Sequence, residues 1–148
     1  MARAGFFPPY ANSRDVARWS ARGASAIVAA LSDDQPLGVG AIYAKVGLTE
    51  AVVHHQDMRR PLGFPRAIPE ERLRVALGVI ANRPGTGTGG TRRRRGVTLT
   101  ATDIDWSIGS GTEVSGPGEA ILMALAGRRD ALDELSGDGK ALFTRHSD

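Results

Sequence analysis

A glycine- and arginine-rich segment, residues 85–96, constrains the fold more than any other feature of this sequence of 148 residues. It alternates Gly with Thr and then contains four consecutive arginines, Arg92 to Arg95. This composition favours a flexible, solvated linker. Apolar residues recur at helical spacing before the segment and at strand spacing after it. The sequence therefore predicts a helical part at 1–84, a linker at 85–96 and a small α+β domain at 97–148, which together make an α+β protein.

The part before the linker contains three predicted helical segments. Residues 1–12 precede them as an extended arm, because consecutive prolines disfavour a helix there. The first segment spans residues 13–31, and around Gly23 two helices joined by a kink are as well supported as one. The second covers residues 40–58. The third begins after Pro69, where two acidic residues favour the first turn. The residues expected to face a core are Val46, Val53 and Met58 on the second helix and Leu73, Leu77 and Ile80 on the third.

The part after the linker begins with strands. Apolar residues alternate with threonines over residues 97–102, and the alternation continues over 103–108, which is the period of two expected for a strand. A third short strand is predicted at 112–115, after a glycine-containing turn. The remaining predicted elements are a helix at 119–126, a strand or turn at 131–135 and a short helix ending at Arg145.

Composition limits the chemistry that this chain can perform. It has no cysteine, which excludes disulfides, thiolate metal ligands and a cysteine nucleophile, and which fits a reducing compartment. No apolar run approaches the roughly 20 residues that a membrane span requires, and the N-terminal apolar stretch is too short for a signal peptide. We therefore expect a cytoplasmic protein with no membrane partner.

The second predicted helix carries the strongest candidate for a chemical site. Glu50 and His54 are four residues apart, so on a helix they lie one above the other on the same face. A carboxylate and an imidazole in that position can hold one divalent metal ion between them. The alternative is a solvent-facing pair that contributes only a few tenths of a kcal/mol to stability. His55 would point about 100° away from His54 and is interpreted as a packing or surface residue.

The charged residues that follow His55 have structural interpretations. Asp57 is placed to pair with an arginine, and Arg59 and Arg60 are interpreted as caps of the helix end. The run Arg92 to Arg95 accounts for much of the net charge of +3. Such a run would add weak, salt-sensitive affinity for nucleic acid. Because no recognition motif or interleaved aromatic residue accompanies it, a solvated linker is favoured over a nucleic-acid partner.

Three segments in this order carry a resemblance to a known family. They are Glu50–Gly63, Ala101–Ser107 and Val114–Arg129, and together with their order they span roughly residues 40–146. They resemble the mycothiol-dependent maleylpyruvate isomerase family. The resemblance implies a DinB-like helical bundle followed by a small α+β domain.

The resemblance also implies a set of site residues. In the family a divalent metal, usually zinc, is held by two histidines and one glutamate, and Glu50 and His54 match two of these positions. The third ligand belongs to a first helix that has no counterpart here, so the bundle is expected to be incomplete and the sequence truncated at its N-terminus. His146, a partner chain or solvent would then have to complete the metal site. Arg128 matches the arginine implicated in catalysis, where a guanidinium can pair with a substrate carboxylate.

Three functions follow as expectations. The first is a metal-binding, mycothiol-dependent enzyme that performs cis–trans isomerisation or thiol transfer on a small-molecule substrate. The second is a non-catalytic remnant that acts as an interaction or oligomerising protein, since a bundle lacking a helix exposes an apolar stripe and a homo-oligomer would cover it. The third is a weak nucleic-acid binder that uses the arginine run.

Overall fold

The computed structural model describes residues 41–83 and 90–146, together with residues 17, 18, 20–23, 25, 26 and 29. The chain divides into two compact units, Met1–Gly38 and Val39–Asp148, and each is described by itself. The arm predicted at residues 1–12 lies outside the described residues.

The first unit contains helical residues on both sides of Gly23. Residues 17, 18 and 20 precede it, and residues 25, 26 and 29 follow it. Gly23 itself has a φ of +78°, a left-handed conformation that a helix cannot continue through. Of the two alternatives for this region, the described residues therefore agree with an interruption at Gly23.

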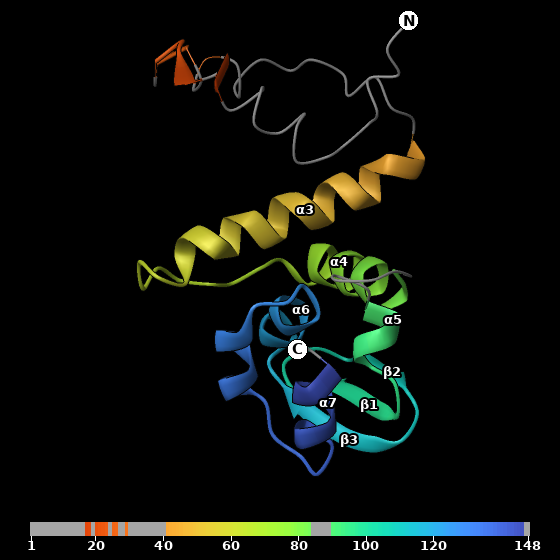
Figure 1. Cartoon of the computed structure of the whole chain (residues 1–148). Coiled ribbons are helices and arrows are strands. Elements are labelled where there is room, and N and C mark those ends of the chain that lie inside the picture. The colour runs from red at the N-terminus through yellow and green to blue at the C-terminus, as the bar shows by residue number, and fades with distance from the viewer. Residues whose placement is uncertain are drawn as a thin grey trace, which may run out of the picture. The chain divides into compact units, whose positions relative to one another are not determined.

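Two helices open the second unit and confirm two predicted elements (Figure 1). The helix α3 comprises Ala41–Arg59, and α4 comprises Glu70–Asn82. Pro69 occupies the N-cap position of α4, and acidic residues in its first turn interact favourably with the positive end of the helix dipole. The two helices pack against each other.

The core between these helices follows the predicted pattern on α4 but only partly on α3. On α4, Leu73, Leu77 and Ile80 are buried as predicted. On α3, Val53 is buried, but the prediction was wrong for Val46 and Met58, which are 37% and 59% exposed. The reason is that the face of α3 that contacts α4 also carries polar residues, so periodicity of apolar residues alone did not identify it.

A small mixed sheet follows in the second unit. Its strands are β1 (Val97–Ala101), β2 (Ser107–Gly109) and β3 (Thr112–Gly116), in the order β2-β1-β3. β1 pairs antiparallel with β2 and parallel with β3. The strand predicted to continue through residues 103–108 was wrong over 103–106, where the chain bends before β2 begins.

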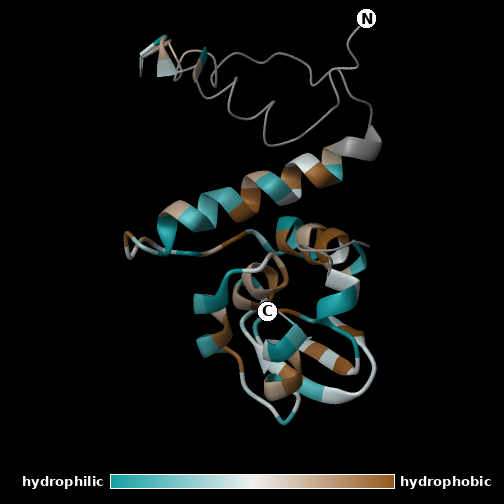
Figure 2. Cartoon of the chain, viewed as in Figure 1, coloured by the Kyte–Doolittle hydropathy of each residue, from teal (hydrophilic) through white to brown (hydrophobic). Residues whose placement is uncertain are grey.

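The helix α6, Gly118–Leu125, lies at the centre of this unit, and all of its residues are buried. It contacts α4 and also packs against β1 and β3 (Figure 1). In Figure 2 α6 is drawn mostly in brown tones, whereas teal segments recur along α3. Asp103 Oδ1 accepts a hydrogen bond of 2.7 Å from the N–H of Gly118 and so satisfies the buried start of α6.

Two short helices complete the chain. The segment predicted as a strand or turn at 131–135 is instead the 3-10 helix η1, Arg129–Glu134. It packs on α6 with Ala131 and Leu132 buried, which explains why its apolar residues do not alternate as in a strand. The last helix, α7, comprises Lys140–His146 and agrees with the prediction.

The described part of the predicted linker is an ordered, packed element. Gly90–Arg93 form the short helix α5, in which Arg93 is buried. Arg93 Nη1 donates to the carbonyl oxygen of Ala124 at 3.1 Å, and Arg94 Nε donates to that of Ala81 at 2.8 Å. These carbonyls lie at the ends of α6 and α4, where helical oxygens lack the regular hydrogen bond to the N–H four residues further on. The prediction of a solvated linker is therefore wrong for residues 90–94.

The α+β class is confirmed, because helices and a small mixed sheet are combined in the described residues. The sequence predicted a boundary at residues 85–96, whereas the observed boundary between the two units lies between Gly38 and Val39. The elements on both sides of the predicted boundary, α4 and α6, share one core. Among the described residues, no helix has the length and apolar character needed to cross a membrane.

Candidate functional site

The predicted metal pair lies on one face of α3. Glu50 Oε2 and His54 Nε2 are 3.8 Å apart, and their side chains are 47% and 67% exposed. The other carboxylate oxygen of Glu50, Oε1, accepts a hydrogen bond of 2.9 Å from Arg83 Nη1 on the segment after α4. Helix geometry therefore brings the acid and the imidazole together as expected, and both side chains are exposed to solvent.

A carboxylate occupies the opposite nitrogen of the same imidazole. His54 Nδ1 lies 3.2 Å from Asp57 Oδ2, one helical turn further along α3. Because a carboxylate only accepts hydrogen bonds, this contact fixes the proton of a neutral imidazole on Nδ1. The lone pair of Nε2 then faces Glu50, which is the orientation that a metal ligand needs.

Asp57 is held in turn by Arg128, as the prediction of an arginine partner required. Arg128 Nε and Nη2 donate to the two carboxylate oxygens at 2.8 and 2.6 Å. The hydrogen bond from Arg128 is the largest influence on Asp57 and lowers the pKa of this carboxyl group, and the neighbouring His54 acts in the same direction. Asp57 therefore stays ionised to a lower pH than an isolated aspartate does.

Arg128 connects α3 with the end of α6. Besides its two contacts with Asp57, it donates through Nη1 to the carbonyl oxygen of Ala126 at 2.7 Å. That third contact caps the C-terminal end of α6. The fork of Arg128 thus contacts a protein carboxylate in this structure, and its predicted contact with a substrate carboxylate stays a prediction.

The other histidines lie away from the facing atoms of Glu50 and His54. His55 is exposed, and its Nε2 accepts a hydrogen bond of 3.1 Å from Arg59. His146 lies on α7, with Nδ1 3.3 Å from the carbonyl oxygen of Arg93. Within residues 41–83 and 90–146 and the few described ones before them, no three His, Asp or Glu side chains are arranged to hold a metal ion.

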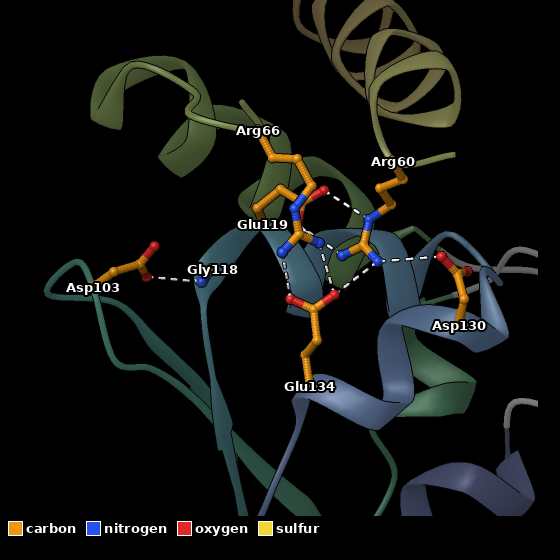
Figure 3. Close-up of polar contacts among 7 residues, drawn as sticks. All are labelled: Arg60, Arg66, Asp103, Gly118, Glu119, Asp130 and Glu134. Atoms are coloured by element: carbon orange, nitrogen blue, oxygen red, sulfur yellow. Dashed lines mark hydrogen bonds and ion pairs between the residues drawn. The ribbon is translucent and has the colours of Figure 1, made fainter. Parts of the chain in front are cut away.

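A second group of charged residues, which the sequence did not indicate, joins the end of α3 to α6 and η1 (Figure 3). Arg60 donates through Nε and Nη2 to the carboxylate of Glu119 at 2.9 and 2.7 Å, and both side chains are less than 10% exposed. Arg66 donates to both oxygens of Glu134 at 2.7 Å. Arg60 Nη1 also reaches Glu134 at 2.9 Å and Asp130 at 3.2 Å. We call these five residues the ion cluster.

The charges in the ion cluster stabilise one another. Burial acts to lower the pKa of Arg60, but the hydrogen bond and charge of Glu119 and the charge of Glu134 outweigh it, so the pKa is raised. The hydrogen bond from Arg66 is the main cause that lowers the pKa of Glu134. The interpretation of Arg60 as a helix cap was therefore wrong, since its guanidinium is the buried centre of this cluster.

A pocket of about 430 Å³ opens beside the ion cluster. Its lining includes Arg60 and Arg66 together with Asp130, Glu134 and the exposed ring of Phe64. Both arginines already contact carboxylates of the protein. The arrangement thus explains how this corner of the fold is held together, and it leaves neither guanidinium unpaired for an incoming anion.

In comparisons with known proteins, no family model matches the sequence, and no curated protein or solved structure is significantly similar to it.

Proposed function

We propose that this chain is a divalent-metal-binding protein of the mycothiol-dependent maleylpyruvate isomerase type. In this proposal it acts with mycothiol on a small-molecule substrate by cis–trans isomerisation or thiol transfer. The observation that carries the proposal is the position of His54 between two carboxylates. Asp57 contacts Nδ1 and Glu50 faces Nε2, and metal-binding histidines typically have one nitrogen on a carboxylate in this way.

The distance between the two proposed ligands fits a metal ion. Two ligands of a tetrahedral zinc ion with bonds of about 2.1 Å lie about 3.4 Å apart. Glu50 Oε2 and His54 Nε2 are 3.8 Å apart, so a small movement of two exposed side chains suffices to match that distance. The histidine and carboxylate donors are also those that zinc accepts in catalytic sites.

Each neighbouring residue has a definite part in the proposed site. Asp57 holds the proton of His54 on Nδ1, and Arg128 fixes Asp57 by its two-pronged contact. Arg83 holds one oxygen of Glu50 and leaves the other directed toward His54. When bound, a divalent cation supplies the charge that lowers the pKa of a coordinated thiol such as that of mycothiol. In this proposal Arg128 is a positioning residue.

Zinc titration of the full chain tests the metal-binding part of the proposal. Glu50→Gln and His54→Gln are expected to weaken zinc binding by at least about tenfold, because each removes a direct ligand. His55→Gln is the matched control, since it removes an exposed histidine of the same helix that does not face Glu50. Equal losses in the His54 and His55 variants, or the absence of stoichiometric binding, would overturn the metal site.

A turnover assay tests the enzymatic part separately. Zinc-loaded protein is incubated with mycothiol and maleylpyruvate, and the cis and trans isomers are followed by NMR. The trans product is expected only when zinc and mycothiol are both present, and the His54→Gln variant should not form it. Stoichiometric zinc binding without any turnover would contradict the proposed reaction while leaving the metal site intact.

A second candidate function, an interaction or oligomerising protein without catalysis, is favoured by exposed apolar side chains. Met58, Leu62 and Phe64 are each more than half exposed at the end of α3 and in the loop after it. Neighbouring exposed apolar residues commonly mark protein contacts. A melting temperature that rises with protein concentration, together with sedimentation as a dimer, would support this function, and a concentration-independent monomer would contradict it.

A further inference from the structure

A groove lies between α3 and the start of α4, and it adjoins the proposed metal site because His54 is one of its lining residues. One part, of about 240 Å³, lies between α3 and the segment that leads into α4, and its lining includes Gln56, Arg59 and Ile68. The adjoining part, of about 340 Å³, extends along α3 past Met58. The two parts share three lining residues, Val52, His55 and Arg72.

The groove is basic and has no opposing acid. No Asp or Glu lines either part, whereas Arg72 lines both. Within the described part of the chain, Arg72 has neither a hydrogen bond nor an ion pair, and its side chain is exposed. This differs from the ion cluster, where both arginines contact carboxylates. An unpaired guanidinium beside a groove presents several N–H donors in one plane, which suits a carboxylate or phosphate.

Arg59 and His55 place further donors at the same groove. Arg59 Nε donates to His55 Nε2 at 3.1 Å, and Arg59 Nη1 donates to the carbonyl oxygen of Pro65. Because Nε2 of His55 accepts, the proton of a neutral ring is on Nδ1, which is then available as a donor. The groove also has apolar lining residues, and in the larger part His54 lies beside them. The apolar residues are Val52, Ala67, Ile68 and Pro69 in one part and Leu48, Ala51, Val52 and Met58 in the other.

Gln56 is a buried polar residue beside the groove. Its side chain is only 1% exposed, yet its Oε1 has no hydrogen-bond partner. Buried amide oxygens almost always have one. Gln56 lines the smaller part of the groove, but its unpaired Oε1 is itself inaccessible, so a bound molecule could reach this oxygen only after the side chain rotates.

From these observations we infer that the groove binds a small organic anion, in which a carboxylate or phosphate group is joined to an apolar portion. The anionic group pairs with Arg72 and accepts from His55 Nδ1, and the apolar portion lies against Val52 and Ile68. After its side chain rotates, the amide of Gln56 can hydrogen-bond to the polar end of the ligand. The inference does not depend on a metal ion at Glu50 and His54.

The experiment is an NMR titration of the full chain with benzoate, phenyl phosphate, inorganic phosphate and benzylamine. Both aromatic anions are expected to shift the amide signals of residues 52–59, 68 and 70–72, and the cation benzylamine is expected to leave them unchanged. Arg72→Gln should weaken binding by at least about tenfold, because a charge-assisted hydrogen bond is lost. Arg92→Gln, which makes the same change at an exposed arginine outside the groove, is the matched control.

A second variant separates binding from folding. Gln56→Leu removes a buried amide that lacks a partner, so the melting temperature should stay the same or rise, whereas the affinity for the anions should fall. Binding of benzoate that is unaffected by Arg72→Gln, or equally weakened by Arg92→Gln, would overturn the site. Inorganic phosphate binding as tightly as phenyl phosphate would overturn the apolar part of the inference, and no shifts with any anion would overturn all of it.

Discussion

The ion cluster and the Glu50–His54 pair begin within ten residues of each other, but they place charge in opposite surroundings. Arg60 and Glu119 are less than 10% exposed and satisfy each other in a two-pronged contact. Glu50 and His54 are about half and two-thirds exposed, and their facing atoms are too far apart for a hydrogen bond. Buried charges must be paired within the protein, and exposed ones need not be. The first group is therefore structural, and the second retains atoms that can bind something else.

The most direct way to break this comparison is to remove Arg60. Arg60→Ala removes both hydrogen bonds to the buried carboxylate of Glu119 and leaves it only the longer contact of 3.4 Å with Arg66, so it is expected to lower the free energy of unfolding by about 3–5 kcal/mol. The matched control is Arg74→Ala, which removes an exposed pair with Glu70 and an exposed hydrogen bond to the carbonyl oxygen of Asp105 and should cost less than about 1 kcal/mol. Urea denaturation followed by circular dichroism measures both values.

A double variant keeps that prediction testable if Arg60→Ala does not fold. Arg60→Met combined with Glu119→Leu removes both charges, and replacement of a whole buried pair by apolar residues is often tolerated. It should therefore be more stable than Arg60→Ala alone. Equal loss in Arg60→Ala and Arg74→Ala would show that the ion cluster is no more important to the fold than a surface pair.

The dependence of stability on pH extends this comparison, because acid protonates the carboxylates that are paired with arginines. The pKa values of Glu134 and Asp57 are lowered in the folded protein, chiefly by hydrogen bonds from Arg66 and Arg128. A lowered folded pKa adds stability above the unfolded values of about 4 and removes it as the pH falls through the folded values. The free energy of unfolding should thus decline below about pH 4.

The acid effect can be assigned with two variants and a control. Glu134→Gln and Asp57→Asn together should flatten the decline, since neither position then binds a proton. Asp138→Asn, an exposed position outside both pairs, should retain the wild-type slope. A decline of unchanged steepness in the double variant would mean that other groups control acid unfolding.

Asp57 supports His54 of the exposed pair and is itself held by Arg128, so its replacement should have an intermediate effect on stability. Asp57→Asn weakens the contact with Arg128 and is expected to cost about 1–2 kcal/mol. It should also weaken zinc binding by about tenfold or more, because the support on His54 Nδ1 changes. Denaturation and zinc titration of the same sample measure both effects. Loss of stability with undiminished zinc affinity would remove Asp57 from the proposed metal site.

The smallest effect on stability is expected for Arg83, which contacts Glu50 of the exposed pair. Arg83→Gln removes a surface contact with Glu50 in which both side chains are more than 40% exposed. Such contacts contribute little, so the free energy of unfolding should change by less than about 0.5 kcal/mol. A loss as large as that for Arg60→Ala would contradict the view that charge is structural only where it is buried.

Local patterns predicted the parts of this fold that depend on neighbouring residues. Leu73, Leu77 and Ile80 recur at helical spacing, and the sequence correctly placed them on the buried face of α4. Alternation likewise identified β1 and the positions of its buried residues. The i,i+4 spacing of Glu50 and His54 predicted that they share a face, and their side chains are neighbours.

Contacts between distant residues could not be predicted in the same way. Arg60 and Glu119 are 59 positions apart, and no local pattern distinguishes them from surface charges. The error at residues 90–94 has a related cause, because glycine was interpreted as a sign of flexibility. A Cβ added to Gly90 would lie 2.0 Å from the carbonyl oxygen of Ile80, so this glycine permits close packing of α5 on α4.

The complete burial of α6 has a consequence for how the protein opens. Its residues, Gly118–Leu125, have no exposed side, so their amide hydrogens reach solvent only when the surrounding core separates. Deuterium should therefore replace them at the rate set by global unfolding, and replace the amides of the solvent-facing α3 through smaller, more frequent openings. The exchange rate of α6 thus reports global unfolding, and the faster exchange of an outer segment gives the free energy of its local opening by comparison.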